Sequence, residues 1–381
     1  MNARDVKTAA DARALVNERG LSHVKVAIVD LDGVMRGKYM AKEKFFSALE
    51  SGFNFCDVIF GWDSNDQLYE NATFTGWHTA FPDALVHIVP ETCRDVPDEG
   101  NMVFFMGEFA GHAKDVCPRG LLNRVIARGE EMGYLATVAA EFEFFVFNET
   151  PHSVREKGYK NLENLTPGFY GYSMLRSSVE SDFYHDLLEM TAAMDVPIEG
   201  LHTETGPGVL EAAIEHSDAM VAADRAAIFK TFSKVLAERQ GKMLTFMAKW
   251  SNDWPGQSGH LHVSLKGKDG KSVFHEEGKP GSMSDEMRWF VGGADAGTPR
   301  HGRLHGQQLF AAGAGLLGAD GCDLGDRESN LCAAGDPRFA EEPAGRVPGG
   351  RRRHQSLSGD RRSARLRAVG HREQNRTGCA H

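Results

Sequence analysis

The feature that most constrains this chain is an apolar strand that carries two acids. Residues 139–145 (AAEFEFF) have the aromatic and aliphatic bulk of a buried β-strand. Because side chains alternate across a strand, Glu141 and Glu143 lie on one face. Two carboxylates held close together among apolar neighbours repel each other and resist desolvation unless a cation neutralises them. The segment therefore predicts a cation-binding face on a core strand, and the alternative is a pair of acids on a solvated edge.

A second acidic segment has a bend between its glutamates. Residues 202–211 (HTETGPGVLE) place Gly-Pro-Gly between Glu204 and Glu211. Such a bend can return both acids toward one point. Mg²⁺ and Mn²⁺ favour carboxylate oxygens in arrangements of this kind. Taken alone, the segment is equally typical of an ordinary loop with surface acids.

A third segment brings histidines into a strand. Residues 256–264 (GQSGHLHVS) run from a glycine-bearing loop into alternating residues, so that His260, His262 and Ser264 share one face. Either histidine can ligate a metal or contact a phosphate. A single His-X-His pattern is more often structural, so the weight of this segment depends on the other two.

Periodicity outlines an α+β chain. We expect helices at Ala10–Glu18, Leu121–Met132, Ser178–Met194 and Ser217–Gln240, two strands within Val24–Met40 around an Asp-Gly turn, and further strands at Thr137–Phe147 and His260–Leu265. The irregular alternation favours an antiparallel sheet over a doubly wound one. The length of 381 residues is typical of two or three domains.

Charge and hydropathy exclude several classes of function. The formal net charge of −10 argues against a nucleic-acid-binding surface, which needs clustered Lys and Arg. No run approaches the roughly 20 apolar residues of a membrane helix, and the first ten residues lack a signal-peptide core. We therefore expect a cytoplasmic protein that acts on small molecules, without nucleic-acid or membrane partners. The six cysteines show no paired metal-ligand spacing and are expected to be free thiols.

Together and in this order, the three segments resemble the glutamine synthetase family. That family has an acid pair on a strand, a Glu-X-Gly-Pro-Gly-X-X-Glu loop, and a glycine-rich loop followed by His-X-His-X-Ser. The resemblance extends over residues 20–293 and includes 32–38 (DGVMRGK) and 60–64 (FGWDS). It is strongest to the branch of γ-glutamyl-amine and γ-glutamyl-polyamine ligases.

The resemblance implies a fold and an activity. We expect a β-grasp-like N-terminal domain at 1–112, a glutamine synthetase catalytic domain with an antiparallel sheet at 113–293 that is incomplete at its C-terminal end, and an aberrant tail at 294–381. The activity would be ATP-dependent ligation of the glutamate γ-carboxylate to an amine through γ-glutamyl phosphate, with two Mg²⁺ or Mn²⁺ ions. Glutamate and the amine would be the substrates, in a ring-shaped homo-oligomer.

The same resemblance assigns roles to individual residues. Glu143, Glu204 and Glu211 would hold one divalent ion, Glu141 and His260 a second; His262 and Ser264 would face the nucleotide, Gly256 the glutamate, and Asp63 the amine site of a neighbouring subunit as a catalytic residue. One departure is Val209, where many members have glutamine. This departure puts a glutamate or nucleotide contact in doubt and removes no metal ligand.

Other functions remain open. Residues 26–33 (VAIVDLDG) also resemble the Asp-X-Asp-Gly motif of haloacid-dehalogenase-type phosphatases, in which Asp30 would be the phosphorylated nucleophile. Within the glutamine synthetase family, the chain may instead be read as an enzyme that uses ammonia or as a non-catalytic binding protein. Retention of all five expected metal ligands argues against the non-catalytic alternative.

The composition changes after Gly293. Residues 294–381 contain 14 Arg but no Lys, Ile, Met, Trp or Tyr. Such a tail lacks the apolar bulk that offsets ordering entropy, which predicts disorder. The family's arginine-rich segment and last metal-binding glutamate are absent from this range.

A shifted reading frame accounts for the tail. With suitable codons, a one-base slip turns residues 323–332 into a segment that contains Asn-Arg-Thr. The same slip turns residues 346–347 and their neighbours into Val-Glu-Tyr-Arg, and it turns residues 354–359 into Ile-Asn-Pro-Tyr-Leu. These resemble the family's segments in the family's order. In the same frame residues 309–318 end in Phe-Trp-Ala-Pro, with an aromatic where ammonia-using members have a glutamate. We therefore predict an extra base near Gly292-Gly293 and an inactive chain as written.

Overall fold

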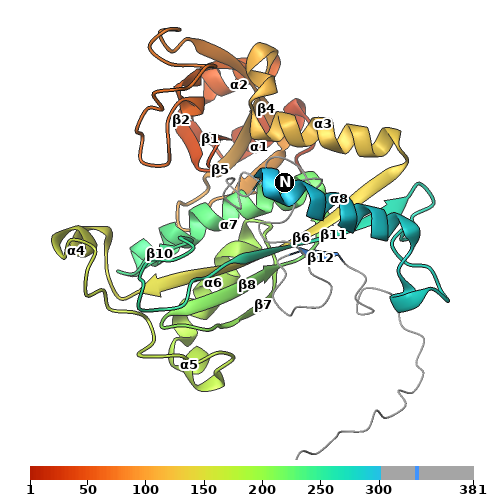
Figure 1. Cartoon of the computed structure of the whole chain (residues 1–381). Helices are drawn as coiled ribbons and strands as arrows, with labels where there is room; N and C mark the ends of the chain where they lie inside the picture. The colour runs from red at the N-terminus through yellow and green to blue at the C-terminus, as the bar shows by residue number, and fades with distance from the viewer. Residues whose placement is uncertain (302–330, 334–381) are drawn as a thin grey trace, which may run out of the picture. The chain divides into compact units, whose positions relative to one another are not determined.

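The computed structural model describes residues 1–301 and 331–333. A mixed five-stranded sheet is built from the first 109 of them, with strand order β2-β1-β5-β4-β3 (Figure 1). Its strands are β1 His23–Val29, β2 Met35–Ala41, β3 Phe53–Cys56, β4 Asp83–Asp95 and β5 Val103–Phe109. Strand β1 runs parallel to β5, and the other neighbours are antiparallel. This is the β-grasp-like arrangement that the sequence predicted.

Two helices and three short 3₁₀ turns accompany this sheet. They are α1 Ala9–Glu18, α2 Lys42–Ser51, η1 Ala3–Asp5, η2 Asp57–Phe60 and η3 Gly111–Asp115. Helix α1 begins with a reciprocal cap, in which Thr8 accepts from the Asp11 N–H and Asp11 accepts from the Thr8 N–H. Phe45 of α2 packs 4.8 Å from the ring of Phe105 in the core beneath the sheet.

The turn between β1 and β2 explains the Asp-Gly motif. Asp30 is 1% exposed, and its Oδ1 accepts the N–H groups of Asp32 and Val34. Its Oδ2 accepts from Arg36 Nε at 2.8 Å. A carboxylate that holds a hairpin turn and is closed off from solvent is unsuited to be a nucleophile. The phosphatase alternative is therefore wrong for this chain.

A second, seven-stranded sheet carries the acidic segments. Its main path has the order β12-β11-β6-β8-β7, and β9 and β10 pair with β6. The strands are β6 Tyr134–Phe147, β7 Ile198–Thr203, β8 Val209–Ile214, β9 Ser217–Asp218, β10 Met243–Thr245, β11 Gly259–Gly267 and β12 Leu331–Ala333. All pairs are antiparallel except β11 with β12. The predicted antiparallel sheet is confirmed.

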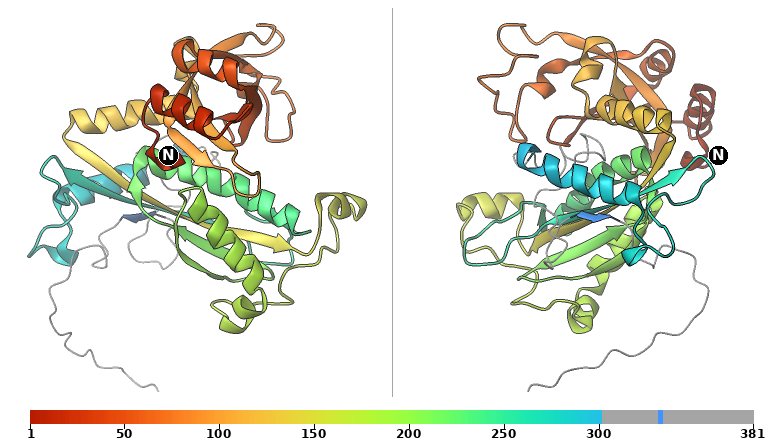
Figure 2. Two further views of the ribbon diagram at one scale, coloured as in Figure 1. Left: turned by 180° about the vertical axis from the view of Figure 1, so that it is seen from behind. Right: turned by 45° about the vertical axis from the view of Figure 1, so that its right-hand side comes forward.

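Helices cover one face of this sheet (Figure 2). The helices of this part are α3 Pro118–Glu131, α4 Pro151–Glu156, α5 Met174–Val179, α6 Ser181–Ala193, α7 Ala219–Arg239, η4 Pro280–Ser282 and α8 Asp285–His301. The single helix expected over 178–194 is two helices, because the backbone at Glu180 leaves the helical region and α6 begins anew. None of the helices in the described ranges is long and apolar enough to cross a membrane.

The tail prediction falls largely outside the described residues. Residues 294–301 continue α8 across the predicted boundary at 293, and 331–333 form β12. Residues 302–330 and 334–381, where disorder was expected, are not described. Free thiols are confirmed for Cys56, Cys93 and Cys117.

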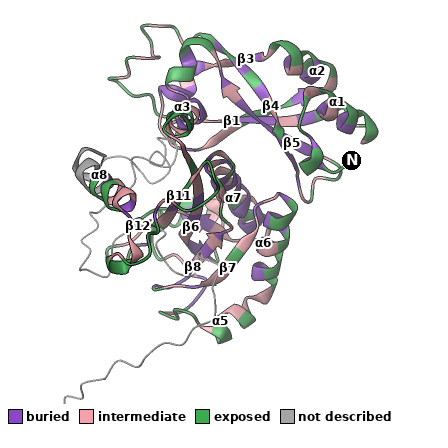
Figure 3. Ribbon diagram, turned by 90° about the vertical axis from the view of Figure 1, so that its right-hand side faces the viewer, coloured by how far each residue is buried: buried purple, intermediate pink, exposed green. Residues whose placement is uncertain are grey.

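A shared core joins the two sheets. Phe144 and Leu210 of the second sheet are buried with Phe229 of α7, in one cluster with Phe104 and Met106 of β5. Figure 3 shows buried residues gathered where α6 and α7 meet the strands. This packing fixes which face of β6 is apolar and leaves the opposite face for polar groups.

Candidate active site

Alternation along β6 points its acids away from the helices. The rings of Phe142 and Phe144 lie 5.8 and 5.9 Å from the ring of Phe229 on α7. Glu141 and Glu143 alternate with these residues, so their side chains leave the opposite face of the sheet. Both acids are half-buried. The local sequence thus puts apolar bulk into the core and two carboxylates on the far side.

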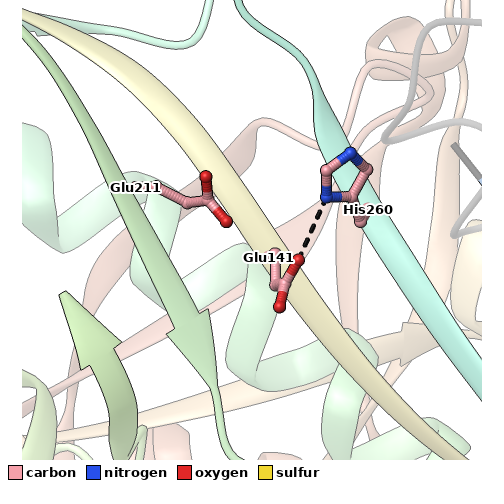
Figure 4. A group of neighbouring side chains, drawn as sticks. All are labelled: Glu141, Glu211 and His260. Carbon is pink, nitrogen blue, oxygen red and sulfur yellow. Dashed lines mark hydrogen bonds and ion pairs between the residues drawn. The ribbon is translucent and has the colours of Figure 1, made fainter. Parts of the chain in front are cut away.

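Strand register brings the three segments together. Glu143 is directly opposite Glu211 on β8, and Glu141 is directly opposite His260 on β11. Glu211 is in turn opposite His202 on β7. Because neighbouring strands are about 4.8 Å apart, residues distant in sequence become immediate neighbours. Ligand atoms of Glu141, Glu211 and His260 lie within 4.8 Å of one another (Figure 4).

A second group of possible ligands shares Glu211 with the first. Ligand atoms of His202, Glu204 and Glu211 also lie within 4.8 Å of one another. His202 was not among the expected site residues, although its signal was present: two positions before Glu204 on a strand, it had to share that residue's face. Two overlapping groups with a common carboxylate have the layout of a site for two cations.

The chemistry of Glu204 fits a cation. Its Oε1 accepts the N–H and the hydroxyl of Thr205, each at 2.8 Å. Its Oε2 is buried and has no hydrogen-bond donor within the described residues. Burying a carboxylate oxygen without a donor is costly; His202 Nδ1 lies 3.8 Å away, and a divalent ion would supply further positive charge. A carboxylate on the surface needs no bound cation, because water solvates its charge.

The protonation of the cluster reflects its crowding. The hydrogen bond with His260 and the close approach of His262 hold the pKa of Glu141 far below its usual range. The bond with Glu141, 3.0 Å from Nδ1, raises the pKa of His260. Burial, and then the charges of Glu141 and Glu143, raise the pKa of Glu211. The ionisation of these groups is therefore coupled through their close contacts.

The Gly-Pro-Gly bend requires glycine at its end. Gly208 has φ +71°, and a Cβ there would stand 2.5 Å from the carbonyl oxygen of Val146. The Gly208 N–H donates to Thr166 Oγ1 at 2.7 Å. Only glycine allows this left-handed, close approach without strain. The bend fixes Glu204 at the end of β7, one hairpin away from Glu211.

The loop before β11 binds Glu143. The N–H of Ser258 donates to Glu143 Oε2 at 3.0 Å, and its hydroxyl is 3.2 Å from Oε1. Gly256, the expected glutamate contact, lies two residues earlier, where a Cβ would stand 2.8 Å from the carbonyl oxygen of Ala248. The loop therefore places an exposed stretch of backbone beside the carboxylate cluster.

The two residues expected at the nucleotide lie further along β11. His262 Nε2 is 3.2 Å from Glu141 Oε2, so this histidine also faces the cluster. Ser264 is on the same face and pairs with Thr137. At about 3.4 Å per residue, Ser264 is about 14 Å along the strand from His260. His262 and Ser264 thus continue the face of the cluster along β11.

Asp63 is not part of this cluster. It follows η2 in the five-stranded half, and its Oδ1 accepts the N–H groups of Asn65 and Gln67 in its own loop. Arg36 Nη1 bonds Asp66 of that loop at 2.6 Å, and its guanidinium lies 5.0 Å from the centre of the Trp62 ring. The loop is well anchored, and its acid belongs to a separate surface.

Tyr172 was missed by sequence reasoning. Its ring stacks on His202 at 4.3 Å between centroids and 26° between planes, yet the residue is 71% exposed. Burial, and then the charges of Glu204 and the other carboxylates, raise the pKa of its hydroxyl. The sequence signal is weak, because an aromatic in a loop has no periodicity to place it.

Carboxylates and histidines from neighbouring antiparallel strands thus converge in two groups with the ligand chemistry of a divalent-cation site. Residues 115–300 match the family described as "Glutamine synthetase, catalytic domain". This part of the chain therefore belongs to the glutamine synthetase family. The fold, the site geometry and the family match agree.

Known relatives are ligases by name. The chain is 44% identical over 274 residues to Type-1 glutamine synthetase 2 of Dictyostelium discoideum, covering 71% of this chain and 52% of that protein. It is 31% identical to a glutamate–isopropylamine ligase of a Pseudomonas species, and the match covers 77% of this chain and 65% of that protein. It is 27% identical to the gamma-glutamylputrescine synthetase PuuA of Escherichia coli, covering 70% and 58%. The chain thus spans about half to two thirds of the length of these relatives.

Solved structures share the fold. The structure titled "GmaS/ADP complex-Conformation 1" superposes with a TM-score of 0.65 at 21% identity, covering 78% of this chain and 65% of that one. A Plasmodium falciparum glutamine synthetase superposes with a TM-score of 0.64 at 17% identity, covering 82% and 64%. At these identities the likeness concerns the fold alone.

Proposed function

We propose that the chain is built for ATP-dependent ligation of the glutamate γ-carboxylate to an amine. The observation that carries the proposal is the pair of ligand groups that share Glu211, with Glu141 and His260 on one side and His202 and Glu204 on the other. Two adjacent sites for Mg²⁺ or Mn²⁺ suit phosphoryl transfer between two anions, a nucleotide and a carboxylate. The family membership of residues 115–300 supports the same chemistry.

In this proposal the acidic residues and His260 are the ligands of two ions. Glu143, Glu204 and Glu211 hold one ion, and Glu141 and His260 hold the other. Bound ions supply the positive charge that stabilises the transferring phosphoryl group on its way to γ-glutamyl phosphate. Their ligands are kept in place by the strand ladder, and Ser258 fixes the orientation of Glu143.

Other residues would bind the substrates. His262 and Ser264 extend along β11 toward the nucleotide, and the backbone at Gly256 faces the glutamate. Asp63 would act in the amine site of a neighbouring copy, which requires a homo-oligomer. The family resemblance implies that this oligomer is a ring. Its position in a separate loop, away from the glutamates of its own chain, supports an intermolecular role. We place the enzyme in the cytoplasm.

The amine is proposed to be an alkylamine or polyamine. Relatives are named for isopropylamine, ethanolamide and putrescine products or substrates. The frame-restored flap has an aromatic in place of a glutamate, and a large apolar face favours an alkyl chain over ammonium. A glutamine synthetase that uses ammonia is the second candidate, because the relative with 44% identity is named as one.

A base deletion tests the function and the reading frame together. We propose that the chain as written is inactive because it lacks the family's arginines and last glutamate, and that deleting one base near the Gly293 codon restores activity. The assay measures metal-dependent γ-glutamyl product from glutamate, ATP and a panel of amines that includes ammonia. Product from the restored chain but not from the 381-residue chain supports both parts. Robust turnover by the 381-residue chain contradicts the frame argument, and greatest turnover with ammonia contradicts the amine assignment.

A further inference from the structure

A cavity of about 280 Å³ opens where β6 ends, beside the Gly-Pro-Gly bend. Its walls come from the loop after β6, the bend and the loop before β11, and they comprise Asn148, Glu163, Asn164, Leu165, Thr166, Pro167, Pro207 and Trp254. Two of these loops also serve the cation cluster. Pro207 follows Glu204 by three residues, and Trp254 precedes Gly256 by two.

The polar groups of this cavity lack positive partners. The exposed carboxylate of Glu163 accepts only a long bond, 3.4 Å, from the Asn148 side-chain amide, and no cationic side chain within the described residues pairs with it. Asn164 Oδ1 is buried and has no donor in the described part of the chain. The Glu163 carboxylate is therefore an exposed anionic acceptor in the cavity wall, which suits a ligand that carries positive charge and donates hydrogen bonds.

The remaining walls are apolar. Trp254 lies 6.1 Å from Phe169, centroid to centroid, and 37% of Trp254 is exposed. Pro167 and Pro207 add rigid apolar surface on the other sides. An indole face attracts an ammonium group and also packs against methylenes. A carboxylate with aromatic and apolar surface beside it has the features that recognise an alkylammonium ion.

We infer that this cavity binds the distal ammonium group of a diamine or polyamine whose other nitrogen is the acceptor for the γ-glutamyl group. The inference rests on the proposed function and narrows its substrate class from alkylamines to amines with a second cationic nitrogen. Three residues of extended chain span at most about 11 Å, so the cavity is within that distance of Glu204 along the bend. A short methylene chain can bridge such a gap, with the Glu163 carboxylate accepting from the far nitrogen.

Calorimetry on the full 381-residue chain tests the inference without turnover. The ligands are 1,4-diaminobutane and n-butylamine, which differ only in the second nitrogen, at one ionic strength and one Mg²⁺ concentration. The diamine is expected to bind about tenfold more tightly, the effect of one charge-assisted bond at a partly exposed site. Glu163→Gln should remove this preference, whereas Glu156→Gln, an exposed acid on α4 outside the cavity lining, should keep it.

The outcomes separate this inference from the proposed function. Equal or undetectable binding of the two amines by the unaltered chain, or a diamine preference that survives in Glu163→Gln, overturns the cavity assignment. Within the described residues the Glu163 side chain has one hydrogen bond, the long one from Asn148, so the Gln variant should fold, and its unfolding midpoint checks this. A diamine preference in the 381-residue chain, together with no product from any amine in the frame-restored chain, would leave the cavity in place and contradict the ligase. Product formation without a preference for the diamine would support the ligase and overturn the cavity assignment.

Discussion

Removing the charge of Glu211 should have opposite effects with and without metal. Glu211 is half-buried, and its carboxylate lies within 4.8 Å of a carboxylate oxygen of Glu141. Two unit charges at 4.8 Å repel by about 3.5 kcal/mol at an effective dielectric constant of 20. Because solvent reaches the pair, a net value of about 1–2 kcal/mol is appropriate. Glu211→Gln keeps the shape and should stabilise the metal-free chain by that amount.

The pH dependence has a definite sign. The folded-state pKa of Glu211 is raised by burial and by its acidic neighbours, whereas an unfolded glutamate titrates near 4.3. The unfolded state therefore loses its proton first, and the ionised group destabilises the fold as pH rises through this window. The gain from the Gln variant should be absent well below pH 4 and complete above the raised pKa.

Metal reverses the order of stability. At a Mn²⁺ concentration 100 times its dissociation constant, the unaltered chain gains about 2.7 kcal/mol. The Gln variant should gain little, because Glu211 belongs to both ligand groups. Urea unfolding in chelator and in Mn²⁺ measures both effects. A variant that is less stable than the parent in chelator, or that gains as much from Mn²⁺, would refute the reasoning.

Glu149 provides a matched control. It is 3% exposed, but its carboxylate accepts from Ser153 Oγ at 2.6 Å and from the Glu163 N–H at 2.9 Å, and it pairs with Lys157. A buried acid whose acceptors are satisfied stabilises the fold. Glu149→Gln should therefore destabilise the chain by about 1–3 kcal/mol with or without metal.

Three further substitutions probe the scaffold. Arg36→Lys loses the planar fork that bonds two aspartates and should speed amide exchange over residues 61–69, and unchanged exchange there would contradict the anchoring role. Lys230→Met removes an amine whose pKa burial lowers to about 7, whereas an unfolded lysine titrates near 10.4. The substitution should therefore stabilise the fold by about 2–4 kcal/mol at pH 7, and the gain should fall as pH rises and be nearly gone above about pH 11, as denaturation at several pH values would measure. Thr8→Ala removes the α1 cap and should lower unfolding free energy by about 1 kcal/mol, a loss that Thr8→Ser should largely restore.

Local patterns were sufficient where side-chain alternation decides the outcome. The two-residue period of 139–145 placed Glu141 and Glu143 on one face, and the structure has Phe142 and Phe144 packed on the opposite face against α7. The Asp-Gly turn and the helix before β6 are likewise within reach of sequence, because their signals are short-range. The interruption at Glu180 was missed, since the periodicity continues across it.

Long-range register was beyond local sequence reasoning. The sequence of residues 202–211 does not predict that Glu211 lies opposite Glu143, because pairing between strands depends on the whole sheet. Family resemblance supplied that information for the expected ligands, and it supplied none for His202 or Tyr172. Those two side chains are placed by geometry alone: one by its strand neighbour Glu204, the other by stacking on the imidazole.

The placement of the acids divides the proposed chemistry between two surfaces. The cation ligands come from strands of one sheet, so a single folded chain can assemble them. Asp63 is instead held in a loop of the other sheet, where Arg36 and its own neighbours fix the backbone. An acid so firmly anchored away from the cluster cannot reach it by a small loop movement, because the anchoring bonds would break first. Metal binding should therefore survive in an isolated chain, whereas any step that needs Asp63 at the amine requires a second copy to present it.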